Sequence, residues 1–162
     1  MNELADEIEE GIKKFAVSER GYAYEFDGLG NSLFIDDANV PSLLSLPYLE
    51  VCAPDDELYL NTRYRVTSEA NPYFFAGAAA TGIGSQHTPE GHIWPIAIAM
   101  QALTSTSTTD LDRVLDLLEG NDANTGMMHE SFHKDDSTRF TREWFSWADM
   151  TYLELVLKTY KF

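Results

Sequence analysis

The feature that most constrains the fold is a predicted helix from Trp94 to about Leu103, whose residues 96–100 are apolar on every side. Trp94 and Pro95 open it, and a proline is well placed in the first turn of a helix. A helix without a polar face cannot lie on a surface, so other elements must cover it all round. The rest of the chain must therefore supply those covering elements.

Several other segments have helical periodicity and are candidates for this covering layer. Residues 110–119 carry one apolar face and end at Gly120, while residues 144–160 are apolar on more than one face. Residues 2–16 show one stripe that we expect to be buried, made of Leu4, Ile8, Ile12 and Phe15. Shorter helices are predicted at 42–46, after a proline, and at 55–66.

One segment near the N-terminus follows a different pattern. Residues 21–26 alternate like a strand, and the turn residues that follow predict a short β-hairpin or extended loop near 21–35. Helices with one stripe would form the outside of a toroid and fully apolar helices the inside. The sequence thus predicts one all-α domain over 1–162, forming part of a helical toroid, with a flat bundle as the alternative.

Composition limits the partners. The 162 residues carry a formal net charge of −16, which argues against nucleic acid and against anionic membrane surfaces. A neutral ligand such as a sugar is compatible with this charge. Cys52 is the only cysteine, so we expect a half-buried thiol and no cysteine-based metal site. Without a leader or an apolar run of membrane length, we expect a cytoplasmic protein.

The densest group of chemically active residues lies between 127 and 149, where two interpretations compete. His129, Glu130 and His133 fit the pattern H-E-x-x-H, which on a helix binds zinc, and Glu154 is available as a third ligand. Alternatively, Glu130 is a glycosidase base that takes a proton from water among aromatic rings that face a sugar.

Two further polar segments attract attention. Asp37 and Asn39 precede Pro41 and form either a polar rim for sugar hydroxyls or a simple helix cap. Gly82 and Gly84 suggest a dinucleotide loop, but the third glycine and the βαβ context are missing. His87, in the same loop, either bonds a ligand hydroxyl or caps the loop.

Six segments resemble glycoside hydrolase family 125, the exo-acting α-1,6-mannosidases, in the same order. They begin with Asp36-Asp37-Ala38-Asn39-Val40-Pro41 and continue to 49; the others are residues 82–89, 93–95, 100–105, 129–136 and 141–148. The resemblance spans nearly the whole chain but only the C-terminal part of the family's domain. It implies an (α/α)6 toroid, of which this chain would be roughly the second half.

The resemblance also implies a metal-independent, inverting hydrolysis of terminal α-1,6-linked mannose, with Glu130 as the general base and no cofactor. It gives weight to a mannoside-binding set made of Asp37, Asn39, His87, Trp94, His129, Arg142 and Trp144. From the residues alone, the two tryptophans either stack on sugar or belong to the core. Arg142 either orients a carboxylate or hydroxyl, or pairs with Asp135 or Asp136.

One part of the family's machinery has no counterpart here. The family's general acid lies in an Arg-Pro-Ser-Asp-Asp segment that this sequence lacks. We therefore expect little or no turnover by this chain alone. The alternatives are a non-catalytic mannoside-binding or structural fragment and, less favoured, a zinc protease. Apolar faces left uncovered in half a toroid predict self-association or a partner chain carrying the other half.

Overall fold

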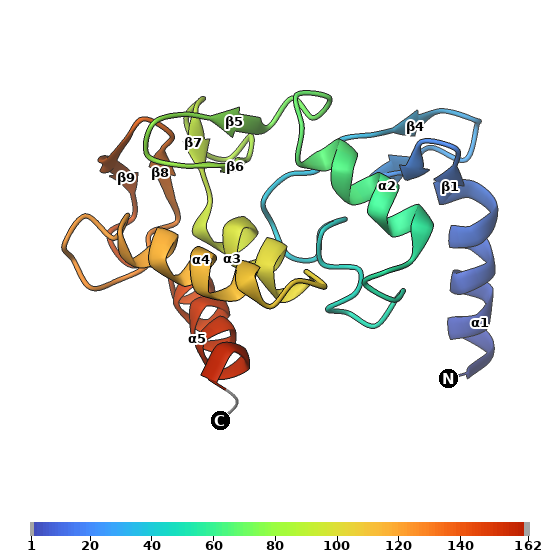
Figure 1. Cartoon of the computed structure of the whole chain (residues 1–162). Coiled ribbons are helices and arrows are strands. Elements are labelled where there is room, and N and C mark those ends of the chain that lie inside the picture. Colours follow the sequence, from blue (N-terminus) through green and yellow to red (C-terminus); the bar gives the residue numbers. More distant parts are fainter. Residues whose placement is uncertain (1, 161–162) are drawn as a thin grey trace.

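The computed structural model describes residues 2–160 and combines helices with small antiparallel sheets (Figure 1). The helices are α1 (Asn2–Gly11), the π-helix η1 (Ile12–Ala16), α2 (Glu57–Val66), α3 (Pro95–Leu103), α4 (Thr109–Glu119) and α5 (Ser146–Tyr160). The strands are β1 (Val17–Ser18), β2 (Gly21–Tyr22), β3 (Glu25–Phe26), β4 (Ser32–Leu33), β5 (Phe74–Ala76), β6 (Thr81–Ile83), β7 (His92–Ile93), β8 (Ser131–His133) and β9 (Asp136–Thr141).

The all-α prediction is wrong. Over the described residues, β1–β2, β3–β4 and β5–β6 form two-stranded sheets and β7–β8–β9 a three-stranded sheet, all antiparallel. Most of these strands are two or three residues long, which is too short for alternation to stand out in the sequence. The chain is a mixed α/β structure and not an all-α toroid. The predicted hairpin near 21–35 is confirmed as the β3–β4 pair.

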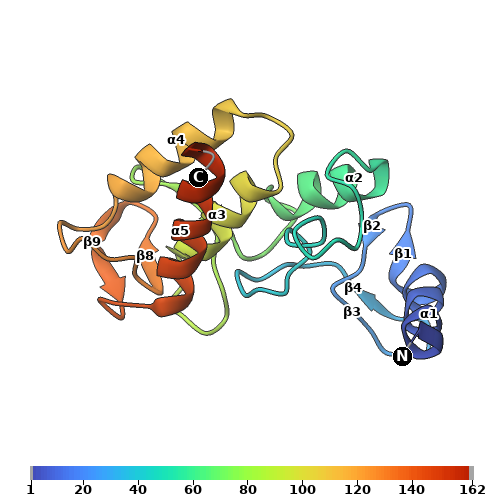
Figure 2. The ribbon, with the colours of Figure 1, turned by 90° about the horizontal axis from the view of Figure 1, so that it is seen from below.

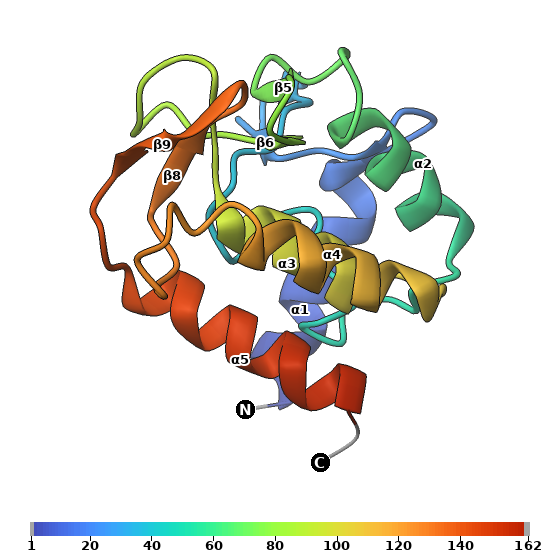
Figure 3. The same ribbon diagram turned by 60° about the vertical axis from the view of Figure 1, so that its left-hand side comes forward.

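Helix α3 occupies the centre of the core, as its composition predicts. It packs against both α4 and α5, and Figure 3 shows α5 running below α3 and α4. Eight of its nine residues are buried, and only Gln101 is partly accessible. Seen from below, α3, α4, α5 and the β8–β9 hairpin form one side of the molecule, while α1 and β1–β4 form the other (Figure 2).

Two predictions about the burial of apolar side chains on the outer helices are wrong. The N-terminal stripe is not buried, because the side chains of Leu4, Ile8 and Phe15 are 63%, 54% and 47% exposed. Helix α5 also has an apolar face in solvent instead of neighbours on all sides. That face, which we call the α5 face, consists of Trp147, Met150, Leu153 and Leu157. Described residues 2–160 include no helix long and apolar enough to cross a membrane.

The predicted short helix at 42–46 is replaced by turns. The carboxylate of Asp36 accepts the backbone N–H groups of Leu43 and Leu44 from outside the segment, at 3.0 and 3.2 Å. Ser42 and Ser45 exchange further bonds between themselves. The turns are closed by i→i+3 backbone bonds, from the N–H of Ser45 to the carbonyl oxygen of Ser42 and from the N–H of Leu46 to that of Leu43. The helix predicted at 55–66 is present as α2, which starts two residues later, at Glu57, after the Asp56 cap.

Burial raises the pKa of Asp36 to about 7, although the two backbone donors act in the opposite direction. A folded-state pKa above the unfolded value favours folding at low pH, and this contribution is lost as pH rises through about 7. We expect the unfolding free energy of the wild type to fall relative to Asp36→Asn between pH 5 and 7, by up to about 1.4 kcal/mol per pH unit. Urea titrations at both pH values measure this difference, and parallel pH profiles would contradict it.

Candidate active site

Glu130 immediately precedes β8, at the open end of the β8–β9 hairpin. Its N–H donates to the carbonyl oxygen of Thr141 at 3.2 Å, which extends the ladder by one residue. The H-E-x-x-H segment is therefore extended and not helical, so the geometry that a zinc helix requires is absent. Among the described residues no three His, Cys, Asp or Glu side chains are grouped to hold a metal, and Glu154 accepts from the hydroxyl of Tyr48.

The carboxylate of Glu130 faces a charged partner at the edge of the molecule. Arg142 Nε lies 3.4 Å from Glu130 Oε1; the Glu130 side chain is 13% exposed and that of Arg142 is 65% exposed. Arg142 has a left-handed backbone with φ of +47°, which is uncommon for a residue with a side chain. This conformation follows the end of β9 and brings the guanidinium beside Glu130. Arg142 thus pairs with Glu130, whereas Asp135 pairs with Lys134.

His129 lies beneath Glu130 and is only 1% exposed. Its Nδ1 is 2.8 Å from the carbonyl oxygen of Glu143, and its Nε2 is 3.1 Å from the carbonyl oxygen of Asp122. The ring stacks on Phe140, with centroids 3.9 Å apart and planes 7° apart. Both nitrogens are therefore occupied within the protein, and the structure places this predicted mannoside-binding residue behind the site surface.

A second cluster of polar residues forms where the segment around Asp37 meets residues 84–94. We call residues 84–94 the 84–94 loop. Asp37 is 3% exposed and accepts from both the backbone and the amide of Asn39. The hydroxyl of Ser85 donates to Asp37 at 3.4 Å and accepts the backbone N–H of His87 at 3.2 Å. The imidazole of His87 is exposed. Asp37, Asn39 and His87 thus lie together, with Ser85 joining them.

The aromatic residues connect this loop to Glu130. Trp94 is 2% exposed and its indole N–H donates to the hydroxyl of Thr88, so it belongs to the core of the 84–94 loop. Its ring meets Phe145 edge to face, with centroids 5.8 Å apart, and the guanidinium of Arg142 lies 5.6 Å from the same Phe145 ring. Trp144 is 64% exposed and therefore available to a ligand.

A hollow of about 270 Å³ lies between α3, α5 and residues 40–48. Its lining includes Val40, which follows Asn39 in the chain, and Trp147, which contacts Phe145 at 5.7 Å between centroids. Tyr48 and Glu154 contribute polar oxygens to its wall. Clefts with an apolar lining and a few placed polar groups are the usual form of sugar and small-molecule sites.

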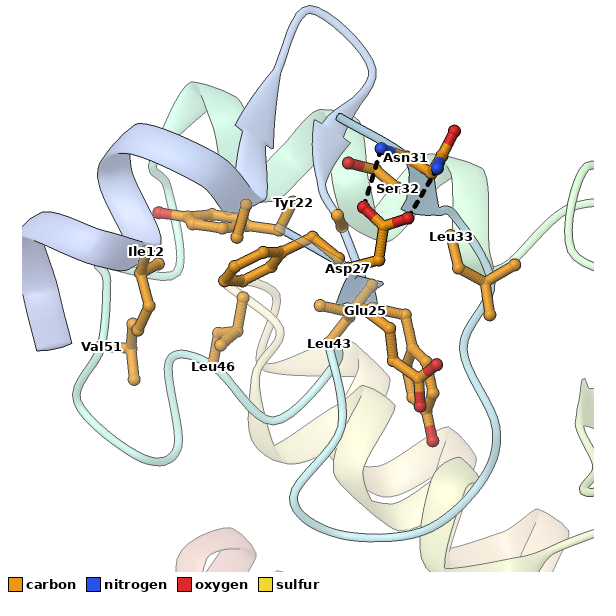
Figure 4. Close-up of a pocket in the computed structure, with 14 residues that line it drawn as sticks. Ile12, Tyr22, Glu25, Asp27, Asn31, Ser32, Leu33, Leu43, Leu46 and Val51 are labelled. Carbon is orange, nitrogen blue, oxygen red and sulfur yellow. Dashed lines mark hydrogen bonds between the residues drawn. The ribbon is translucent and has the colours of Figure 1, made fainter. Parts of the chain in front are cut away.

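A larger hollow of about 830 Å³ lies on the other side of the molecule (Figure 4). Apolar side chains including Ile12, Leu46 and Val51 line it, and an Asp27–Asn31 hydrogen bond lies at its edge. None of its lining residues belongs to the group around Glu130. Its apolar lining is typical of a surface that packs against polypeptide.

Gly82 and Gly84 serve packing instead of phosphate binding. A Cβ at Gly84 would meet the carbonyl oxygen of His92 at 2.1 Å, and one at Gly82 would meet Ile93 at 2.7 Å. The glycines therefore allow β6 to approach β7 closely. The close packing of β6 against β7 therefore explains the glycine pair, which the dinucleotide interpretation does not explain.

Several residues behind the site were missed by sequence reasoning. Asp149 accepts the backbone N–H of Met128 at 2.9 Å, two residues before Glu130. The Ser131 hydroxyl oxygen lies 2.7 Å from the hydroxyl oxygen of Thr141 and 3.1 Å from Nδ1 of His92. Ser131 therefore connects these two side chains. Burial, with His133 and Arg139 nearby, lowers the pKa of His92 and favours a neutral ring. Such partners come from distant segments, so no local spacing indicates them.

Comparison with known proteins places this geometry in context. The sequence model of the metal-independent α-mannosidases of glycoside hydrolase family 125 matches residues 1–157. The meiotically up-regulated gene 157 protein of Schizosaccharomyces pombe is 44% identical, over 94% of this chain and 31% of its own length. The chain thus spans about a third of that relative.

A solved structure provides the corresponding comparison of coordinates. It is a metal-independent α-mannosidase of Streptococcus pneumoniae in a non-productive complex with α-1,6-mannobiose, 50% identical to this chain. The TM-score is 0.95, and the match covers 99% of this chain and 39% of that one. With a family match over nearly its full length, this chain belongs to glycoside hydrolase family 125, the metal-independent α-mannosidases.

Proposed function

We propose that this chain supplies the general-base side of an inverting exo-α-1,6-mannosidase, with Glu130 as the base. The observation that carries the proposal is the placement of Glu130, a carboxylate that is largely but not fully buried and lies beside Arg142. A base must be reachable by a water molecule, and the 13% exposure of the Glu130 side chain leaves room for that approach.

The proposed substrate is a terminal α-1,6-linked mannoside. The solved relative binds α-1,6-mannobiose, and a 50% identical chain with the same backbone has the same framework for a site. In this chain, the exposed Trp144 offers a ring face to a sugar, while Asn39 and His87 offer polar groups at the 84–94 loop. Stacking on the apolar face of a sugar and bonding its hydroxyls are the two ways in which such sites hold ligands.

The proposed mechanism needs a second carboxyl group that this sequence does not identify. An inverting enzyme has an acid about 6.5–9.5 Å from its base, with a water between base and sugar. The segment in which the family carries its acid has no match here. General acid assistance contributes about 10²–10⁴ in rate, so the chain alone is expected to turn over very slowly.

A chimera tests the proposal. We would replace the matching 39% of the Streptococcus pneumoniae mannosidase with this chain, since the backbones agree at a TM-score of 0.95. We expect the chimera to release mannose from α-1,6-mannobiose and the isolated chain to release about 10²-fold less or nothing. A folded chimera without activity would contradict the proposal, and so would full activity in the isolated chain.

A second candidate function is mannoside binding without catalysis, for which the exposed Trp144 ring and the polar groups of the 84–94 loop are the supporting features. In that case the isolated chain binds α-1,6-mannobiose weakly, and the folded chimera also binds without hydrolysis. Calorimetric titration of both proteins distinguishes the two functions.

We further propose that a polypeptide, either a second copy or the remainder of a family 125 domain, covers the α5 face and the exposed stripe of α1.

A further inference from the structure

Ser131 and Thr141 lie directly next to the candidate base, at the open end of the β8–β9 hairpin. They are the last paired residues of the two strands, and Glu130 and Arg142 each lie one residue beyond them. The N–H of Glu130 also donates to the carbonyl oxygen of Thr141 at 3.2 Å. The pairing of Ser131 with Thr141 therefore decides whether the carboxylate of Glu130 meets the guanidinium of Arg142.

The turn of the hairpin does not by itself fix this pairing. Phe132 pairs with Phe140, but the next residue of β8, His133, pairs with Asp136. Residues 137–139 of β9 are thus accommodated at one irregularity between Phe132 and His133. Such an irregularity leaves residues unpaired and interrupts the ladder. Turn geometry normally sets the register of a hairpin, and here its control ends before the open end is reached.

Burial of apolar side chains specifies the register only in part. A shift by one residue would turn Phe132, which is 1% exposed, to the opposite face, so burial opposes such a shift. A shift by two residues keeps every side chain on its own face, because side chains alternate along a strand. It would place Arg139 or Glu143 opposite Ser131 and so separate the candidate base from its charged partner.

The side chains of the last pair supply the missing specification. The hydroxyl oxygens of Ser131 and Thr141 lie 2.7 Å apart, which is the usual length of a hydroxyl–hydroxyl hydrogen bond. Ser131 is 0% exposed, and its hydroxyl oxygen also lies 3.1 Å from Nδ1 of His92 in the neighbouring strand β7. A hydroxyl donates one bond while it accepts another, so Ser131 serves both neighbours. A shifted register would break the bond to Thr141 at a position that water does not reach.

We infer that Ser131 and Thr141 are positioning residues for the candidate base. Their buried hydroxyl pair, held from β7 by His92, fixes the register at the open end of the hairpin and so keeps Glu130 beside Arg142. The inference rests on the proposed function only for its effect on catalysis, because the register is a property of the folded chain itself.

Hydrogen exchange in the isolated chain tests the register. Thr141→Val keeps the branched shape of the side chain and removes its hydroxyl. The matched control is Thr138→Val in the same strand, where the hydroxyl bonds only locally, to Asp136 at 2.6 Å. We expect Thr141→Val to speed exchange of the Glu130 amide about 2- to 13-fold relative to the control, which corresponds to the loss of one hydrogen bond.

The amides of α3 show whether this effect is local. Equal acceleration at Glu130 and at the α3 amides would show that the hydroxyl only stabilises the chain as a whole, and this would overturn the inference. Unchanged exchange at Glu130 would overturn it too. If Thr141→Val does not fold, Thr141→Ser and Thr141→Ala, which differ by one hydroxyl, are compared with the same expectation.

Kinetics in the chimera test the catalytic consequence. Thr141→Val is expected to lower kcat for α-1,6-mannobiose by up to about 10²-fold, with a smaller change in KM, because a small misplacement near the reacting atoms has an effect of this size. Thr141→Ser retains a hydroxyl and should recover most of the loss, whereas Thr138→Val should show none. Equal kcat in Thr141→Val and Thr138→Val would overturn the positioning role. The exchange measurement requires no turnover, so an inactive chimera refutes the proposed function without affecting the register result.

Discussion

In the chimera described above, Glu130→Gln is expected to lower kcat for α-1,6-mannobiose by about 10²–10⁴, which is the range for loss of general acid–base assistance. Glutamine keeps the size of the side chain but cannot accept a proton from water. Because the contact with Arg142 loses only its ionic part, we expect KM to change much less than kcat. The measurement is the initial rate of mannose release over a range of substrate concentrations.

The matched control is Glu69→Gln, a substitution of the same type at an exposed position just after α2. It should leave both kcat and KM within about twofold of the wild type, since surface substitutions away from special features have small effects. Equal losses in the two variants would show that charge in general, and not Glu130, governs the rate. An active Glu130→Gln chimera would remove Glu130 from the role of base.

The second large effect is on stability and concerns neighbouring leucines of α5. Leu155 is 0% exposed and Leu153 is 43% exposed. Leu155→Ala is expected to cost about 2–5 kcal/mol of unfolding free energy, because it removes buried methyl groups and leaves a cavity. Leu153→Ala in the isolated chain is expected to change it by no more than about 0.5 kcal/mol. Urea titration of the three proteins at one concentration measures both effects.

The same pair tests whether the α5 face is covered by other polypeptide. In the chimera, Leu153→Ala should cost at least about 1 kcal/mol more than in the isolated monomeric chain, because covering the side chain buries its apolar surface. If copies of this chain cover the face instead, the cost in the isolated chain grows with protein concentration. A cost that is small in the chimera and at every concentration would show that this face stays in solvent.

The helical core could be predicted from the sequence, because long segments carry strong periodicity. Helix α3 was predicted as apolar all round and is buried all round. Helix α2 and its acidic start were also predicted, and Asp56 does cap it. The strands around Glu130 were missed, since β8 has only three residues and its partners β7 and β9 are set by distant pairing.

The sequence indicated which segment forms the candidate site, but not its geometry. The segment containing Glu130 stood out through its density of titratable groups, and the structure places Arg142 beside it. His129 and Trp94 were expected to bind mannoside, yet the structure buries both. Residue type and spacing do not reveal exposure when a segment is neither a long helix nor a long strand. The carbonyl partners of His129 also escape prediction, because every residue carries a carbonyl.

Helix α3 has a consequence for how its orientation is encoded. Since Gln101 is the only polar residue in it, polarity contributes little to fixing its rotation about its axis. The alternation of bulk does so instead, with Ala97, Ala99 and Ala102 offering close approach and Ile98 filling the space left by Gly82. Exchanging Ala97 with Ile98 would leave the composition of the helix unchanged and yet misplace a large side chain. The volumes of its side chains therefore determine how α3 is rotated about its axis within the core.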